Sequence, residues 1–241
     1  MPATKKELID SLQKDILQLE GYKPPPAGTQ QLMGLGPIEA AFPNGVFPLG
    51  TVHELVCGTT EEATASSGLI TGLLSVLMQN GGVCLWISLT GNLFPSALVN
   101  FGAEADRLIF IRVMKDQEAL WVMEEALKCP GLVAVIAEVK ELDFKQSRRL
   151  QLAVEQSHVT GFILRNTSKK IGSTACAARW QVKPLPSEAV DGLPGLGFPR
   201  WQIELLRVRN GHPSHWVMEW AAGQFRPVDK KQVLIPERKA G

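Results

Sequence analysis

The sequence contains few cysteines and no CxxC pair. Its four cysteines are far apart, and each lies in or beside an apolar segment: Cys57, Cys84, Cys129 and Cys176. Isolated cysteines in apolar surroundings are typical of buried thiols rather than of disulfides or metal sites. We therefore expect all four to be buried and reduced.

Long apolar runs and an excess of charge are also missing. The longest apolar run, GLITGLLSVLM, is shorter than the about 20 residues that cross a bilayer. The start of the chain, MPATKKELIDSLQKDI, lacks the apolar run and small-residue cleavage site of a signal peptide. We therefore expect a cytoplasmic protein. Lys and Arg total 25 against 24 for Asp and Glu, a net charge of +1, so any DNA contact must rest on a local patch.

The composition that remains is that of a globular protein. Hydrophobic residues make up 45% and charged residues 20% of the 241 residues, which is enough apolar surface for one sizeable core. Apolar segments typical of strands lie at 51–57, 83–89, 107–113, 131–139 and 159–165. Segments typical of helices lie between them, at 69–82, 95–102, 116–129 and 143–157. This alternation predicts an α/β fold with a mostly parallel sheet flanked by helices.

The two ends of the chain differ from this pattern. Residues 179–185 and 201–220 have strand character, and Asn210-Gly211 is a strong hairpin signal, so we expect an antiparallel C-terminal hairpin extension. Residues 1–28 are predicted to form a helix and a Pro-rich linker, residues 29–222 the core domain, and residues 223–241 a basic, flexible tail. Both ends are candidate partner contacts.

A strand, a loop with small residues and a helix form the architecture of a phosphate-binding loop. The loop predicted at 58–68 ends in Ser66, Ser67 and Gly68, and Leu69 and Ile70 follow where the motif requires lysine and a hydroxyl residue. Leu69 cannot neutralise a phosphate, and Ile70 cannot bind magnesium. We therefore expect a vestigial phosphate loop that holds no cofactor and no metal. A glycine-bearing turn before a buried helix fits the same residues.

Several stretches around this loop resemble the core of bacterial RecA, among them GTVHEL, the SSG before the helix, and WISLTGNLFPSALVNFGAEADRLIF. From about Gly36 to Trp220 the chain is more closely similar to the ImuA family, the RecA-like accessory proteins of bacterial error-prone translesion synthesis. The stretches that carry this resemblance are SRRLQLAVE, residues 147–155, and the pair WQIELLRVRNG and WVMEW.

The resemblance to RecA implies that the catalytic residues are lost. Thr90 stands where the water-activating glutamate of RecA would lie, and Arg165 stands at the position of the glutamine that senses the γ-phosphate. Ala137 replaces the magnesium-binding aspartate, and Glu138, one position later, is expected on the opposite face of the strand. The resemblance therefore implies a protein that is not an enzyme. The stretches that form the DNA-binding loops of RecA are also short, so filaments on DNA are not expected.

Other candidate sites have simpler explanations. His212 and His215 are separated by a proline and lack further ligands for zinc. His53 and Cys57 flank a buried strand without a third partner, which favours core packing over a nucleophile. Trp201, Trp216 and Trp220 occupy hairpin positions where aromatic pairs stabilise a sheet.

A basic set of residues allows two interpretations. Lys145, Arg148 and Arg149 share one helical face, and Lys169 and Lys170 follow the strand that ends at Arg165, at the sheet edge where α/β folds bind ligands. These residues, with Arg165 among them, form either a solvated surface or a contact with a partner or DNA.

The family resemblance implies a function and partners. It points to a non-catalytic binding factor in SOS-induced error-prone translesion synthesis. The implied partners are an ImuB-like Y-family polymerase homologue, an alternative replicative-type polymerase and RecA. One alternative is a SulA-like cell-division inhibitor that acts on FtsZ, although the longer chain and the hairpin extension fit it less well. A weak nucleotide-binding protein is a second alternative.

Overall fold

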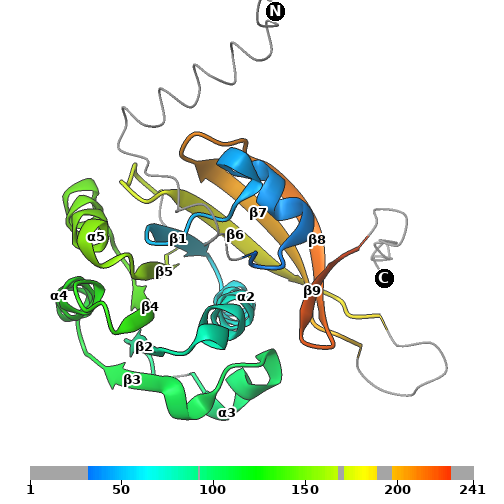
Figure 1. Ribbon diagram of the computed structural model, residues 1–241, viewed down its shortest axis with the longest axis horizontal. Helices are drawn as coiled ribbons and strands as arrows, with labels where there is room; N and C mark the ends of the chain where they lie inside the picture. Colours follow the sequence, from blue (N-terminus) through cyan, green and yellow to red (C-terminus); the bar gives the residue numbers. More distant parts are fainter. Residues whose placement is uncertain (1–31, 92, 168–170, 189–196, 229–241) are drawn as a thin grey trace, which may run out of the picture. The chain divides into compact units, whose positions relative to one another are not determined.

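The computed structural model describes residues 32–91, 93–167, 171–188 and 197–228. These residues form a nine-stranded mixed sheet with the strand order β3-β2-β4-β5-β1-β6-β7-β8-β9 (Figure 1). The strands are β1 (Val52–Cys57), β2 (Val83–Ser88), β3 (Leu108–Arg112), β4 (Leu132–Val139), β5 (Thr160–Asn166), β6 (Ala178–Leu185), β7 (Arg200–Val208), β8 (Ser214–Ala221) and β9 (Gln224–Pro227).

Strands β1 to β5 pair with one another in parallel, and β1 also pairs in parallel with β6. From β6 onward, neighbouring strands run antiparallel. The predicted fold class, a mostly parallel sheet flanked by helices with an antiparallel C-terminal extension, is confirmed. Because the carboxyl ends of parallel strands meet at one sheet edge, the ends of β1, β2, β4 and β5 lie together there.

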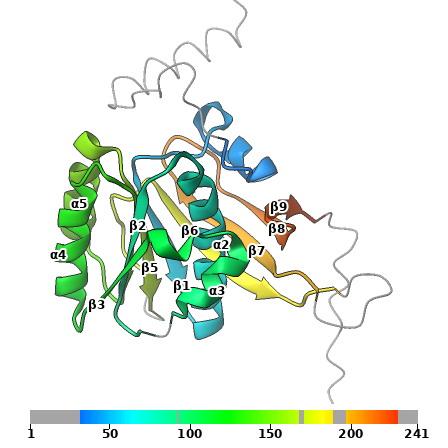
Figure 2. The same ribbon diagram turned by 60° about the horizontal axis from the view of Figure 1, so that its bottom comes forward.

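Helices cover both faces of the sheet. The α-helices are α2 (Thr60–Leu77), α3 (Pro95–Leu98), α4 (Asp116–Leu127) and α5 (Phe144–Ser157). Short 3-10 turns are η1 (Gly36–Ala41), η2 (Pro43–Gly45), η3 (Met78–Asn80), η4 (Val99–Phe101) and η5 (Ala105–Arg107). Figures 1 and 2 show α4 and α5 side by side on one face and α2 on the other.

Successive side chains of a strand point to opposite faces of the sheet, so each strand contributes to two hydrophobic cores, one on each face. On the face of α2, the sheet contributes Leu55, Ile136 and Phe162, which pack with residues of that helix. On the opposite face, Val135 and Ile163 pack with residues of α4 and α5. Strands buried on both faces explain why the central segments of the sequence are almost wholly apolar.

The C-terminal extension packs on α2. Asn210 has a φ of 55° in the turn between β7 and β8, as the Asn-Gly signal predicts. Trp201 and Trp220 are buried in the core, as expected, while Trp216 is half-buried against it. The ring of Phe225, in β9, packs edge-to-face against Trp220, with ring centroids 4.8 Å apart.

Strand β9 lies in the segment where the sequence suggests a flexible tail. It pairs with β8 from Ala221 to Met218, so the described residues beyond Ala222 contribute to the sheet. The remaining boundary predictions, for the N-terminal helix, the Pro-rich linker and the rest of the tail, fall on residues outside the described ranges.

Candidate functional site

The turn between β1 and α2 is where a phosphate loop would lie. Strand β1 ends at Cys57, and α2 begins at Thr60, so only Gly58 and Thr59 connect the two elements. The prediction of a loop over 58–68 is therefore wrong, because most of that segment is the first two turns of α2. A two-residue connection is too short to wrap a phosphate with backbone N–H groups as the motif requires.

The first turn of α2 is closed by its own side chains. The Glu62 carboxylate accepts a hydrogen bond from the Gly58 backbone N–H at 2.7 Å, and the Thr59 hydroxyl accepts one from Glu62 N–H at 3.2 Å. Hydrogen bonds from its own backbone and from Thr59 lower the pKa of Glu61, which keeps that carboxyl ionised. A helix N-terminus attracts anions, but here two carboxylates occupy the position where a phosphate would sit.

The residues expected in the vestigial loop lie inside the helix and the core. Ser66 and Ile70 are fully buried and Leu69 is nearly so, and Gly68 is packed beneath Trp201 and Phe101. Ser67 is half-buried and donates its hydroxyl to the Ala63 carbonyl at 2.9 Å. These side chains bind the helix to the sheet and its extension instead of lining a ligand site.

Glu138 fixes the end of β2 to β4. Its Oε2 atom accepts hydrogen bonds from the Ser88 hydroxyl (3.0 Å), the Leu89 and Thr90 N–H groups (3.1 and 3.2 Å) and the Thr90 hydroxyl (3.0 Å). Ala137 packs in the core beneath α4 and α5, so Glu138 projects from the opposite face, as expected. The two positions compared with catalytic acids of RecA therefore contain a buried methyl group and a hydroxyl that serves as a donor to Glu138.

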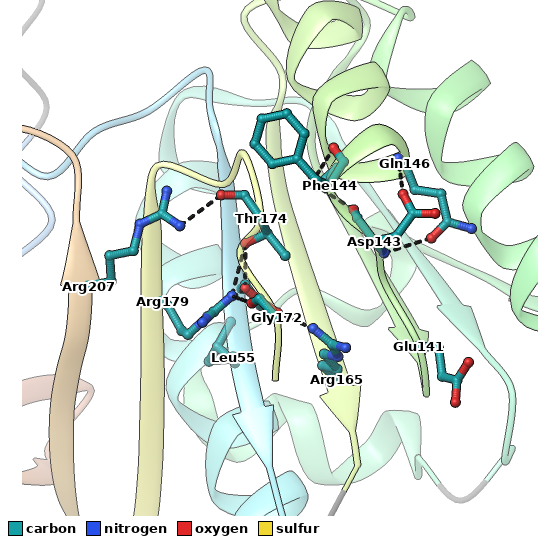
Figure 3. A network of polar contacts seen from close by, with 12 residues as sticks. Leu55, Glu141, Asp143, Phe144, Gln146, Arg165, Gly172, Thr174, Arg179 and Arg207 are labelled. Atoms are coloured by element: carbon teal, nitrogen blue, oxygen red, sulfur yellow. Dashed lines mark hydrogen bonds and ion pairs between the residues drawn. The ribbon is translucent and has the colours of Figure 1, made fainter. Parts of the chain in front are cut away.

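A second buried acid, Glu54, lies in the middle of β1 and is fully enclosed. Its carboxylate accepts hydrogen bonds from Arg165 Nη1 at 3.0 Å, Arg179 Nε at 2.8 Å and the Thr174 hydroxyl at 2.8 Å. Figure 3 shows Arg165 and Arg179 reaching toward each other from the strands that flank β1. Arg207 adds a hydrogen bond to the Thr174 carbonyl at 2.8 Å.

This network changes the interpretation of Arg165. The sequence suggests a surface contact, but the side chain is 8% exposed and paired with Glu54. Arg165 therefore joins β5 to β1 inside the protein. A charge that is already matched by a buried carboxylate is poorly placed to sense a phosphate or to contact DNA.

The histidine and cysteine of β1 belong to the core. The His53 ring stacks on Phe47 and donates from Nε2 to the Pro48 carbonyl at 2.8 Å, while Nδ1 accepts from Trp180 Nε1 at 3.4 Å. Burial lowers the pKa of His53 to about 4, although the bond to Pro48 opposes that shift. Burial raises the pKa of the Cys57 thiol to about 11, so it remains a thiol at neutral pH.

The remaining candidates separate into two groups. Lys145, Arg148 and Arg149 lie on α5 and are all exposed, as the helical spacing predicts. Lys169 and Lys170 fall outside the described residues.

The expectation of four buried cysteines is wrong for Cys129, which is exposed just beyond α4 where the helix has ended, while the other three are buried.

No metal centre is formed by the part of the chain that the structure describes, since it holds no group of three or more His, Cys, Asp or Glu side chains that could bind an ion. His212 donates its backbone N–H to the Ala41 carbonyl and lies in the β7–β8 turn.

Among the residues that the structure describes, no helix is both long and apolar enough to span a membrane.

The sequence analysis missed two features of the site, the buried charge of Glu54 and the start of α2, although both left a signal in the sequence. A glutamate within the otherwise apolar VHELVC signals a buried charge that needs a partner, but the sequence does not say which arginine supplies it. Thr59 followed three residues later by Glu62 is the signature of a helix start, and it places the beginning of α2 before the small residues.

These features define an α/β protein with a mostly parallel sheet in which a capped helix follows directly on the first strand. No protein-family model matches the chain. Over 194 residues, the chain is 34% identical to Protein ImuA of Caulobacter vibrioides, in two strains; the match covers 76% of this chain and 80% of that protein. The chain belongs to the ImuA family.

A second similarity is shorter. Over 96 residues, the chain is 31% identical to Cell division inhibitor SulA of Photorhabdus laumondii, which covers 39% of this chain and 54% of that protein.

Proposed function

We propose that this protein is a non-catalytic binding factor in damage-induced, error-prone translesion DNA synthesis, and that it acts through protein partners. Membership of the ImuA family over most of the chain supports the pathway. The observation that carries the non-catalytic part is the junction of β1 and α2, where Glu62 binds the backbone N–H of Gly58.

The chemistry of the junction supports this proposal. Hydrolysis of a nucleoside triphosphate requires a cation for the phosphates, magnesium ligands and a group that positions water. Leu69 and Ile70 are buried apolar residues of α2, and the Glu138 carboxylate is already bound by the end of β2. The carboxylates of Glu61 and Glu62 would also repel an approaching phosphate.

The partners expected from the family are an ImuB-like Y-family polymerase homologue, an alternative replicative-type polymerase and RecA. The exposed basic residues Lys145, Arg148 and Arg149 are proposed contacts for a partner or for DNA, and Lys169 and Lys170 stay predictions of the same kind. The balanced net charge of +1 favours protein contacts over a broad DNA-binding surface.

The proposal is tested by two measurements on the full chain. First, deleting the gene should lower the frequency of mutations induced by DNA damage, and co-purification should recover an ImuB-like protein encoded beside it. Second, ATP and magnesium at millimolar concentration should neither be hydrolysed nor raise the free energy of unfolding. Hydrolysis would contradict the non-catalytic interpretation. A rise of more than about 1 kcal/mol would show selective binding of the nucleotide to the folded protein and would contradict the expectation that no cofactor is held.

A second candidate function, inhibition of cell division, is favoured by the similarity to SulA over 96 residues. Overproduction in the native host separates the two candidates. Filamentous cells with unchanged damage-induced mutagenesis would favour the cell-division function, whereas normal division with altered mutagenesis would favour translesion synthesis.

A further inference from the structure

Helices α4 and α5 lie side by side and leave a groove between them on the outer surface of the protein. The groove has a volume of about 280 Å³. Three apolar and four polar or charged residues line it: Leu120, Trp121, Leu150, Gln117, Gln146, Glu124 and Arg149. In Figures 1 and 2, no described element lies over the outer side of these two helices. The volume of the groove lies at the lower end of the about 300–1,000 Å³ usual for small-molecule sites, which is also enough for one or two side chains of a protein segment.

Trp121 gives the groove an apolar anchor point. Its side chain is 64% exposed, although the other large apolar residues of α4, Leu120, Met123 and Leu127, are buried. On the neighbouring helix, Leu152 is 48% exposed. Exposed tryptophans are enriched at the centres of protein interfaces, because a large rigid ring buries much apolar area at little entropic cost.

The acidic groups of α4 are already engaged within the protein. The Asp116 carboxylate accepts from the Lys140 and Glu141 N–H groups, and Glu118 accepts from Met114 N–H at 3.0 Å. Glu124 pairs across the groove with Arg149 at 2.7 Å. The last exposed acid of the helix, Glu125, pairs with Lys128 at 2.7 Å.

The basic groups of α5 are less fully matched. Lys145 is exposed and makes no hydrogen bond or ion pair among the described residues. Arg148 reaches only Glu155, at 4.0 Å, and both side chains are about half exposed. Exposed pairs of this kind contribute little. The outer face of α5 therefore presents positive charge beside the groove.

We propose that the α4–α5 groove is the docking site for an acidic, amphipathic segment of a partner protein. An apolar side chain of that segment enters the groove against Trp121. The segment extends over the outer face of α5, where Leu152 adds apolar contact and Lys145 and Arg148 pair with its carboxylates. This is recognition of an amphipathic segment in a groove, with apolar anchors for affinity and charges for orientation. The inference rests on the proposed function for the identity of the partner, the ImuB-like polymerase homologue.

The test measures binding of the purified polymerase homologue to the full chain by calorimetry. Trp121→Ala should weaken binding at least tenfold, and Lys145→Glu combined with Arg148→Glu should weaken it at low salt more than at high salt. Phe94→Ala and Lys183→Glu are matched controls, because Phe94 is 73% exposed and Lys183 is exposed on β6. Melting curves should be unchanged for all four, since each altered side chain is exposed.

The outcomes separate the two proposals. Loss of binding in the groove variants with normal binding in the controls supports docking in the groove. Normal binding by Trp121→Ala, or equal losses in the controls, overturns the groove while leaving the proposed function intact. Failure of the unmodified chain to bind overturns the proposed function and, with it, this choice of partner.

Discussion

The Oε1 atom of Glu54 lies 3.0 Å from Nη1 of Arg165, and both side chains are buried, although 111 residues separate them in the sequence. The pair joins β1 to β5 in the centre of the sheet. Arg179 extends the same carboxylate's contacts to β6, so one glutamate links three neighbouring strands and the parallel part of the sheet to its antiparallel extension.

Glu54→Gln should lower the free energy of unfolding by about 3–5 kcal/mol, because it leaves the buried guanidinium group of Arg165 and the partly buried one of Arg179 without their counter-ion. Urea denaturation monitored by tryptophan fluorescence provides the measurement. Arg148→Gln is the control, since that exposed arginine makes only a long ion pair and should change stability by less than about 1 kcal/mol. Equal effects of the two substitutions would show that the buried network does not support the sheet.

Leu69→Lys should destabilise the protein by about 3 kcal/mol or more and should not create ATP hydrolysis. The substitution restores the lysine of a phosphate loop in sequence, but the side chain lies in the core beneath the sheet extension, where a charge is costly. Chemical denaturation and a phosphate-release assay measure the two effects. Leu69→Met conserves volume and should cost less than about 1.5 kcal/mol; turnover by the lysine variant would show that the site has been misplaced.

Gly72→Ala should lower stability even though alanine favours a helix over glycine by about 1 kcal/mol. A Cβ atom at Gly72 would lie 2.6 Å from the Phe225 ring and 2.9 Å from the Trp220 ring, and overpacking of this kind costs about 1–3 kcal/mol. Thermal unfolding measures the change. Gly131→Ala, where nothing lies within 4 Å, should be neutral, and a stabilised Gly72→Ala variant would show that β8 and β9 do not pack on α2.

Stability should fall as the pH decreases from about 6.5 to 4. The pKa of His53 is lowered to about 4 in the folded protein by burial, from an ordinary value of 6.5. Between pH 6.5 and 4, His53 is protonated in the unfolded chain but neutral in the folded protein. The free energy of unfolding therefore falls by about 3 kcal/mol in total across this range. Above pH 6.5 the ring is neutral in both states, and below pH 4 the loss is complete.

Urea denaturation of the unmodified chain and of His53→Gln at several pH values isolates this contribution from that of the carboxylates. The variant should be less stable at pH 8 but should lose less stability between pH 6.5 and 4. Parallel pH profiles for the two proteins would show that His53 takes up its proton in the folded state as readily as in the unfolded chain.

Truncation after Ala222 should lower the free energy of unfolding by about 3 kcal/mol relative to truncation after Val228. The shorter chain loses β9 and the buried ring of Phe225, and removing a buried aromatic side chain costs about 3–5 kcal/mol. Differential scanning calorimetry compares the two proteins. Equal melting temperatures would mean that β9 adds nothing to the fold.

The sequence by itself determined the order and type of most elements. Alternation of apolar strand segments with helical segments predicted the parallel sheet, and Asn210-Gly211 predicted the β7–β8 turn, because both are local signals that need no distant partner. The spacing of Lys145, Arg148 and Arg149 likewise placed them on one exposed helical face.

Tertiary structure decided what local patterns leave open. The small residues Ser66, Ser67 and Gly68 have the composition of a loop, yet they are helical because the turns of α2 that contain them pack between the sheet and its extension. Strand β9 has only four residues, so its pairing with β8 and the packing of Phe225 are needed to reveal it.

Tertiary structure also decided which charged residues and which tryptophans are buried. Arg165 is buried because Glu54, far away in the sequence, supplies its counter-charge, while Trp121 is exposed because its position on α4 points away from the sheet that buries Trp201 and Trp220. Residue type and local periodicity limit which side chains can be buried. Contacts between residues that are distant in the sequence determine which ones are, since burial of a charge or a ring depends on the partner that the fold brings beside it.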